Sequence, residues 1–151
     1  MKTYRNLIFI ALLFIGSVVI AQHTQTDEDA IKKVIQTAYV EGLQNEGDLE
    51  KIDSGIHPGF HLLGIGKENE MWTLPIAEWK ERTVKKLENG QYPKTGKDAV
   101  SIKFLNIDIT GTAAMAKIEF YVGVQLTYID YISLYKFGEN WKMVNKIFYK
   151  L

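Results

Sequence analysis

Four long runs rich in β-branched and aromatic residues fill the last third of the chain, and they constrain its fold more than any other feature. The runs cover residues 100–109, 113–124, 126–137 and 141–149. Glycine-containing turns at Gly111, Gly123 and Gly138-Glu139-Asn140 punctuate them. Runs of this composition joined by short turns are typical of antiparallel strands connected as hairpins. The sequence therefore predicts a sheet of long, consecutive antiparallel strands.

The residues before these strands show helical spacing of apolar side chains instead. We expect a first helix over residues 26–46, a short second helix over 48–55 and a third over 74–88. Thr26 and Asp48 are the expected capping residues of the first two, because their side-chain oxygens can accept from free backbone N–H groups.

A short strand is expected between the second and third helices, over residues 60–65. Residues 70–73 are its expected partner, and His57-Pro58-Gly59 reads as the turn that precedes it. Helices segregated from an antiparallel sheet make an α+β domain. A curved sheet with helices over one face forms a cone, and concave, mainly apolar cavities of this kind bind small molecules.

The composition limits the classes of function. The 151 residues, 46% of them hydrophobic, suit one globular domain. Eighteen basic residues balance eighteen acidic ones, which argues against nucleic acid as a partner. Beyond Arg5 the only arginine is Arg82, so a polyanion site is disfavoured too. There is no cysteine, which excludes disulfides, thiolate nucleophiles and cysteine metal sites.

Residues 1–21 have the three parts of a secretory signal peptide. Lys2 and Arg5 form a positive start, residues 7–20 carry no charge, and Ala21 precedes a polar stretch. The apolar run is shorter than the roughly 20 residues that span a bilayer. The sequence predicts cleavage, a single domain over residues 22–151, and a periplasmic or secreted protein without a stable membrane anchor; an uncleaved N-terminal anchor is the alternative.

The order of elements, together with three stretches of sequence, resembles the putative lumazine-binding family of the NTF2-like superfamily, which has a cystatin-like fold. The stretches are residues 30–48, residues 57–64, and the most specific one, Thr127-Tyr128-Ile129-Asp130-Tyr131-Ile132-Ser133-Leu134 followed by residues 141–148. The resemblance covers nearly all of residues 22–151. It implies an NTF2-like cone, a curved antiparallel sheet wrapped around three helices, and a homodimer.

The resemblance also implies a comparison with the isomerases, dehydratases and cyclases of the superfamily. In the isomerases a tyrosine of the first helix donates a hydrogen bond to a developing oxyanion, and Tyr39 occupies that place. The isomerase base would fall at about Gly64 and the second oxyanion acid near Ser133, so two of the three groups are missing. Tyr39 as a half-buried packing residue is the alternative interpretation.

Asp130 and Lys146 are charged residues within strands that are otherwise apolar. If Gly138-Glu139-Asn140 is the hairpin loop, Phe137 opposes Trp141, and Ile132 faces Lys146 with Asp130 as its diagonal neighbour. An unpaired buried charge is costly, so we expect the two to form a pair. The pair is either a structural ion pair or a polar group in the cavity that holds a ligand or a proton.

The remaining candidates are a histidine and several aromatic residues. His61 is a candidate hydrogen-bonding group of the pocket. His57 and His61 lie about 13 Å apart in an extended chain, too far to share one metal ion, so no metal is predicted. A planar heterocycle would need aromatic walls, and Trp79, Tyr128 and Tyr131 are candidates, with core packing as the alternative for Trp79. The predicted ligand-binding residues are thus Tyr39, His61, Trp79, Tyr128, Asp130, Tyr131 and Lys146.

Three functions remain open from the sequence. The first is an exported domain that binds a small, mostly apolar or heterocyclic molecule in the cone. The second is an enzyme of the isomerase, dehydratase or cyclase type that uses the same cavity. The third is a non-catalytic homodimeric interaction module whose cone is filled by its own side chains. No cofactor is predicted for any of them.

Overall fold

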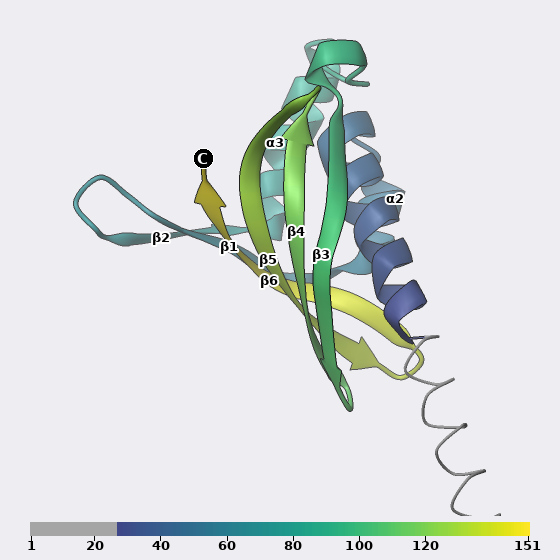
Figure 1. The fold of residues 1–151 in the computed structure, drawn as a ribbon. Helices are drawn as coiled ribbons and strands as arrows, with labels where there is room; N and C mark the ends of the chain where they lie inside the picture. Colours follow the sequence, from purple (N-terminus) through teal and green to yellow (C-terminus); the bar gives the residue numbers. More distant parts are fainter. Residues whose placement is uncertain (1–26) are drawn as a thin grey trace, which may run out of the picture.

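The computed structural model describes residues 27–151, which form an α+β cone (Figure 1). Six strands make one curved sheet, and the helices lie against one side of it. The predicted signal peptide and the predicted cap Thr26 lie outside the described residues. The helices are residues 27–34 continued by η1 (Ile35–Glu46), α2 (Leu49–Gly55), α3 (Ile76–Glu88) and the short η2 (Gly96–Asp98). The strands are β1 (Ile56–Ile65), β2 (Met71–Pro75), β3 (Val100–Thr110), β4 (Ala113–Val122), β5 (Gln125–Phe137) and β6 (Asn140–Lys150).

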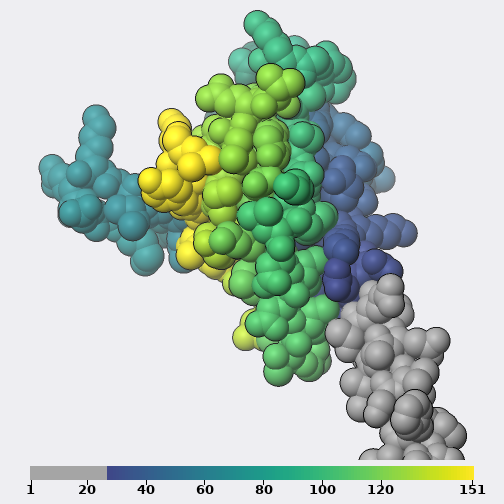
Figure 2. All heavy atoms as spheres, in the orientation of Figure 1, coloured from purple at the N-terminus to yellow at the C-terminus, as the bar shows by residue number. Residues whose placement is uncertain are grey.

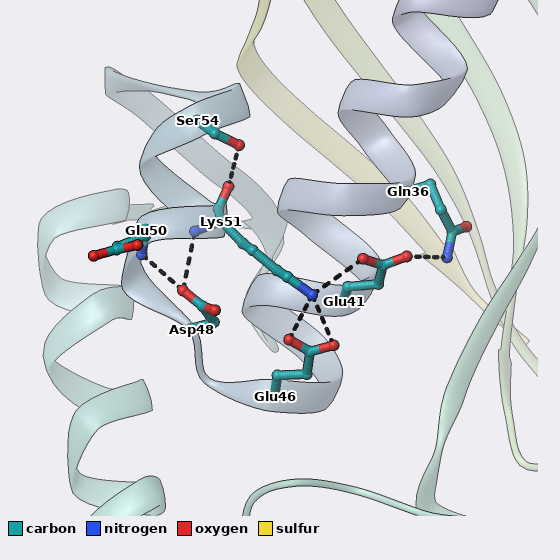
Figure 3. Close-up of polar contacts among 7 residues, drawn as sticks. All are labelled: Gln36, Glu41, Glu46, Asp48, Glu50, Lys51 and Ser54. Atoms are coloured by element: carbon teal, nitrogen blue, oxygen red, sulfur yellow. Dashed lines mark hydrogen bonds and ion pairs between the residues drawn. The ribbon is translucent and has the colours of Figure 1, made fainter.

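The junction between η1 and α2 follows the sequence prediction. Gly47 ends η1 in the left-handed conformation, with φ of 72°, which glycine adopts without steric cost. The side chain of Asp48 then caps α2 by accepting from the backbone N–H groups of Glu50 and Lys51 (Figure 3). The Lys51 ammonium returns to the end of η1 and contacts the carboxylates of Glu41 and Glu46. These exposed contacts fix the angle between the two helices.

The strand order is β2-β1-β6-β5-β4-β3, so β6, the last strand, lies inside the sheet. The predicted hairpins β3–β4, β4–β5 and β5–β6 are present, and all three pairs are antiparallel. The pairing of β1 with β6 is parallel, and this contact between distant segments was not predicted. The β1–β2 hairpin projects from the body of the molecule (Figure 2).

Two local predictions were wrong. His57-Pro58-Gly59 is not a turn but part of β1, where the register against β6 shifts between Ile56 and His61. The third helix begins at Ile76, because Pro75 ends β2 and stands before the first helical turn with extended backbone. A proline tolerates this place because its missing N–H would have no partner there.

The β5–β6 register contains an irregularity that the sequence did not reveal. Phe137 pairs with Asn140, not with Trp141, so the connecting turn is the two residues Gly138-Glu139. The register shifts by one residue between Ser133 and Leu134. The shift restores the expected pairing of Ile132 with Lys146. Two deviations thus cancel, and the side chain of Lys146 faces the same side of the sheet as predicted.

The core lies between the helices and the inner face of the sheet. On β5 the even-numbered positions from Asp130 to Leu134 are buried, whereas the odd-numbered ones face outward and are more exposed. Period-two alternation of this kind marks a sheet with one covered face. From the helices, Ile31, Ile35 and Leu43 enter the same core and are almost fully buried. These helix side chains and the inward-facing strand residues form one continuous hydrophobic core.

Candidate functional site

A cavity of about 190 Å³ lies inside the wide part of the cone, between η1, α3 and the sheet. Its lining residues are Tyr39, Gln44, Leu62, Trp79, Phe120, Tyr128, Lys146 and Phe148. Pockets that hold drug-sized molecules measure roughly 300–1,000 Å³. The cavity therefore suits a smaller molecule, of one or two rings.

Aromatic rings form most of its wall. Tyr39 meets Trp79 edge to face, with ring centroids 6.5 Å apart. Tyr128 meets both Phe120 and Phe148 in the same way, at 5.6 and 5.5 Å. These edge-to-face contacts hold the rings in defined orientations. A planar ligand would therefore meet a rigid aromatic wall.

Three polar side chains form one closed network at the wall of this cavity. The hydroxyl of Tyr39 donates to Oδ2 of Asp130 at 2.9 Å. The ammonium Nζ of Lys146 donates to the same Oδ2 at 2.8 Å and to the Tyr39 hydroxyl at 2.7 Å. Asp130 is fully buried, and Lys146 and Tyr39 are 6% and 2% exposed. The predicted pairing of Asp130 with Lys146 is confirmed, and Tyr39 joins it.

Three distant segments bring these groups together. Tyr39 comes from η1, on the side of the helix that packs into the core. Asp130 and Lys146 come from the inner face of β5 and β6, where Lys146 pairs with Ile132 and lies diagonal to Asp130. Charged side chains reach one another across such a diagonal. The sheet register therefore sets the position of the network.

Burial shifts the pKa of two members of the network. It raises the pKa of the Tyr39 hydroxyl well above 10.0, and the nearby Asp130 carboxylate raises it further. Burial lowers the pKa of the Lys146 ammonium below 10.5, and Asp130 opposes this only in part. Both shifts follow from the cost of placing a charge in an apolar environment.

The network keeps hydrogen-bonding capacity for a ligand. An ammonium group has three donors, and the two contacts of Lys146 use two of them. Oδ1 of Asp130 is buried and has no hydrogen-bond partner among residues 27–151. The side-chain amide of Gln44 also lines the cavity and can both donate and accept. A ligand with one carbonyl or other acceptor could thus be anchored by Lys146.

Of the other predicted site residues, two line the cavity and two do not. Trp79 and Tyr128 line the cavity, as expected for walls of a pocket. His61 lies on the exposed face of β1, where its Nδ1 contacts the carbonyl oxygen of Gly59 at 3.0 Å. Tyr131 lies on the outer face of β5, opposite Ile147. The sequence left open which way His61 and Tyr131 face, and neither is among the residues that line this cavity, since each lies one residue from an inward-facing position.

Gly64 and Ser133, where the isomerases carry their base and their second oxyanion acid, supply no acid to the cavity in the structure either. The indole ring of Trp72 covers Gly64, and a Cβ atom at Gly64 would lie 2.1 Å from that ring. Any acidic side chain there would have to displace the tryptophan. Ser133 belongs to the outward-facing series of β5 and does not line the cavity.

Sequence reasoning missed four lining residues, namely Gln44, Leu62, Phe120 and Phe148. Phe120 and Phe148 lie on the inner faces of β4 and β6, in the same cross-strand neighbourhood as Asp130 and Tyr128. Strand alternation counted outward from Asp130 would have found them. Leu62 required the parallel pairing of β1 with β6, in which it lies opposite Lys146, and no local pattern predicts that pairing.

A second buried ion pair was also missed. Lys136 and the Trp141 indole N–H both donate to Oδ1 of Asp27, at 2.8 and 3.1 Å. This contact joins the start of the first helix to the β5–β6 hairpin. It is remote from the cavity lining, so it stabilises the fold and does not belong to the site.

Three further features of the described residues bear on function. A wider hollow of about 330 Å³ lies beside the β3–β4 turn, but apart from Leu134 the side chains around it are exposed or half-buried, and none of them is a buried charge. Within residues 27–151 no three histidine, aspartate or glutamate side chains are grouped closely enough to hold a metal ion. No helix in this part of the chain has the length and apolarity needed to cross a membrane.

Comparison with known proteins identifies a matching family and solved structures of similar fold. The profile of the family described as "Putative lumazine-binding" matches residues 26–149. No curated protein matches the chain. An NTF2-like protein of unknown function from Shewanella baltica OS155 is similar over 83% of this chain and 94% of its own, with 23% identity and a TM-score of 0.63.

Two other solved structures extend the likeness in fold. A domain of unknown function with a cystatin-like fold from Nostoc punctiforme covers 83% of this chain and 78% of its own, with 10% identity and a TM-score of 0.56. A "putative dehydratase from the NTF2-like family" of Streptomyces avermitilis covers 85% and 98%, with 13% identity and a TM-score of 0.57. At these identities the likeness concerns the fold alone.

Proposed function

The chain belongs to the putative lumazine-binding family, and we propose that it binds a small planar molecule bearing a carbonyl group in the cavity of its cone. The class that best fits is a one- or two-ring heterocycle, of which lumazine, a pteridine with two ring carbonyls, is an example. The ring lies against the aromatic wall, and a carbonyl oxygen accepts a hydrogen bond from Lys146.

One observation carries this proposal, namely that the only charged side chain among the described lining residues is a buried ammonium surrounded by aromatic rings. Nζ of Lys146 lies 5.0, 5.8 and 5.3 Å from the ring centroids of Tyr39, Phe120 and Phe148. A donor in such a dry site gains more from a good acceptor than it would in water. The wall supplies apolar contact and the ammonium supplies orientation, which is how small-molecule sites are usually built.

The test is a calorimetric titration of the full chain with lumazine. Lys146→Met keeps the length of the side chain and removes the donor. Loss of one charge-assisted hydrogen bond costs about 1.5–3 kcal/mol, so we expect affinity to fall about 10- to 100-fold. Trp79→Leu should weaken binding too, because it removes part of the wall.

Tyr131→Phe is the matched control for Tyr39→Phe. Both remove one tyrosine hydroxyl, but Tyr131 lies on the outer face of the sheet and Tyr39 lines the cavity. We expect the first variant to bind as the unmodified chain does and the second to bind more weakly. Equal effects of the two variants, or binding that survives Lys146→Met unchanged, would contradict the proposed site.

We also propose that the protein is exported, as the pattern of residues 1–21 predicts. The support is the charged start, the uncharged run and the small residue Ala21. Fractionation of the producing cell followed by N-terminal sequencing tests this. A mature chain that begins at Gln22 in the exported fraction is expected, and an intact Met1 in the cytoplasm would contradict it.

A homodimer formed through the outer face of the sheet is our proposal for assembly. Its support is a set of exposed large side chains on β5 and β6, namely Tyr135, Ile147 and Tyr149. Sedimentation equilibrium should give twice the monomer mass, and Ile147→Asp should shift it toward the monomer. A monomeric mass for the unmodified chain at high concentration would exclude this assembly.

A further inference from the structure

The lysine–carboxylate pairs of Lys136 and Lys146 have the same length, but their surroundings differ. Nζ of Lys136 lies 2.8 Å from Asp27, and Nζ of Lys146 lies 2.8 Å from Asp130. The hydrogen bond to Asp27 raises the pKa of Lys136, whereas burial lowers the pKa of Lys146. Lys146 also lines the cavity, and Lys136 does not. Of these two lysines, only Lys146 therefore combines a destabilised ammonium with a place in the lining of the cavity.

Two groups beside Lys146 can receive and return its proton. Oδ2 of Asp130 lies 2.8 Å from Nζ and the Tyr39 hydroxyl lies 2.7 Å from it. Transfer of one proton from Nζ to Asp130 replaces two buried charges by two neutral groups, and it leaves the net charge of the site unchanged. A neutral amine in an apolar pocket is the nucleophile that condenses with carbonyl compounds.

We propose that Lys146 forms a Schiff base with a small uncharged aldehyde or ketone that enters the cone, with Asp130 and Tyr39 moving the protons. The inference rests on the proposed function in one respect, because the cavity must admit a small molecule. It goes beyond that function by assigning a covalent chemistry to the same wall.

The step balances without another reactant. The Nζ lone pair attacks the carbonyl carbon, the C–N bond forms, and the carbonyl π electrons move to oxygen. The proton that Asp130 took up first passes through the Tyr39 hydroxyl to that oxygen, so Tyr39 is again protonated and Asp130 is again a carboxylate. Nζ then gives a second proton to Asp130, which produces a neutral carbinolamine. Asp130 then returns a proton to the hydroxyl, which leaves as water while the C=N bond forms. Overall, an ammonium and a carbonyl give a protonated imine and one water.

The cavity also restricts which carbonyl compounds fit. Its volume of about 190 Å³ and its aromatic wall suit a short or aryl-substituted chain. Lys146 is the only cationic residue among the described lining residues, and it is used as the nucleophile. A carboxylate or phosphate on the substrate would find no second cation there, so charged carbonyl compounds are disfavoured.

Two carbonyl probes test the inference on the full chain. Acetylacetone converts a neutral lysine into a stable conjugated enaminone that absorbs at longer wavelength than tryptophan. Formaldehyde with cyanoborohydride, used below one equivalent, traps the imine of the smallest carbonyl compound, so the size of the cavity does not limit it. Peptide mapping then locates the modified lysines. Each unit by which a lysine pKa is lowered raises its neutral fraction about tenfold, so the peptide with Lys146 should be labelled ahead of the exposed lysines. Lys94, whose pKa burial also lowers but which does not line the cavity, is the reference that separates the effect of the cavity from that of burial.

Single substitutions distinguish the role of Lys146 as the nucleophile from the roles of the residues around it. Lys146→Met should abolish the enaminone band. Lys136→Met is the matched control, since it removes a lysine with an equally short ion pair outside the cavity. It should leave the band unchanged. Circular dichroism of each variant confirms that the fold is retained, and Tyr39→Phe gives a second, milder change at the site.

The outcomes distinguish this inference from the proposed binding function. Lumazine has amide-like ring carbonyls that do not condense with amines, so it reports on binding alone. Enrichment of label at Lys146, slowed by added lumazine, supports the covalent chemistry. If neither probe favours Lys146 over the exposed lysines, the Schiff base is overturned whether or not lumazine binds. If Lys146 is labelled but lumazine does not bind, only the heterocyclic ligand is wrong.

Discussion

Removal of the Lys146 ammonium should be among the most destabilising single changes in this domain. In Lys146→Met, Asp130 keeps the donor from Tyr39 and loses the only cation that contacts it within residues 27–151. Oδ1 of Asp130 has no donor to compensate, and the residue is fully buried. Breaking a buried pair from one side costs about 3–5 kcal/mol, because an uncompensated charge remains. That is a large part of the 5–15 kcal/mol typical of a whole domain.

The double variant Asp130→Asn with Lys146→Met provides the decisive comparison. It removes both charges and lets the Tyr39 hydroxyl donate to the asparagine oxygen. Because neutral replacements of a buried pair are often tolerated, we expect the double variant to regain most of the loss. Urea unfolding followed by circular dichroism gives both free energies and shows from the slope whether the unfolded state changes.

The reasoning would be refuted by a loss below about 1 kcal/mol in the single variant, because the pair would then behave as an exposed one. It would be refuted equally by a double variant that is no more stable than the single one.

Three further outcomes follow from the structure. Asp27→Ala leaves Lys136 without its carboxylate and the buried Trp141 N–H without its acceptor, so the midpoint of urea unfolding should fall. Gly64→Ala forces the indole of Trp72 aside and should lower the thermal midpoint, with a cost of about 1–3 kcal/mol; an unchanged midpoint would show that the ring moves freely. Because the pKa of Tyr39 is raised, the folded state keeps a proton that the unfolded state loses, so stability should fall as the pH rises above 10.0; Tyr39→Phe should flatten this fall in alkaline unfolding curves.

The strands and helices were predictable where local chemistry decides them. The glycines between the last four strands and the cap at Asp48 act within a few residues, and the structure agrees there. His57-Pro58-Gly59 was misread because its turn chemistry yields to the ladder with β6, which begins at Ile56. A partner strand about eighty residues away leaves no trace in a local pattern.

The candidate site was likewise predictable where local sequence decides it and not where the pairing of distant strands does. Tyr39, Asp130 and Lys146 were found because a polar residue in an apolar run is conspicuous and must have a partner when buried. The faces of His61 and Tyr131 stayed open because adjacent strand residues face opposite ways, and a short run such as residues 60–63 is apolar on both sides. Trp79 and Tyr128 were predicted as aromatic walls, whereas Phe120 and Phe148 could be added only once the registers of β4, β5 and β6 were known.

The position of β6 between β1 and β5 has a consequence for how the domain assembles. The β3–β4–β5 meander forms from contacts between neighbouring segments, and such local contacts form quickly. The β1–β2 hairpin has no strand partner in the sheet other than β6, so it can join only after that last strand has been added. Closing the long loop between them costs entropy before any contact repays it. We therefore expect the step that seats β1 beside β6 to limit the folding rate, and the ammonium of Lys146 to be sealed into the cone in that same step.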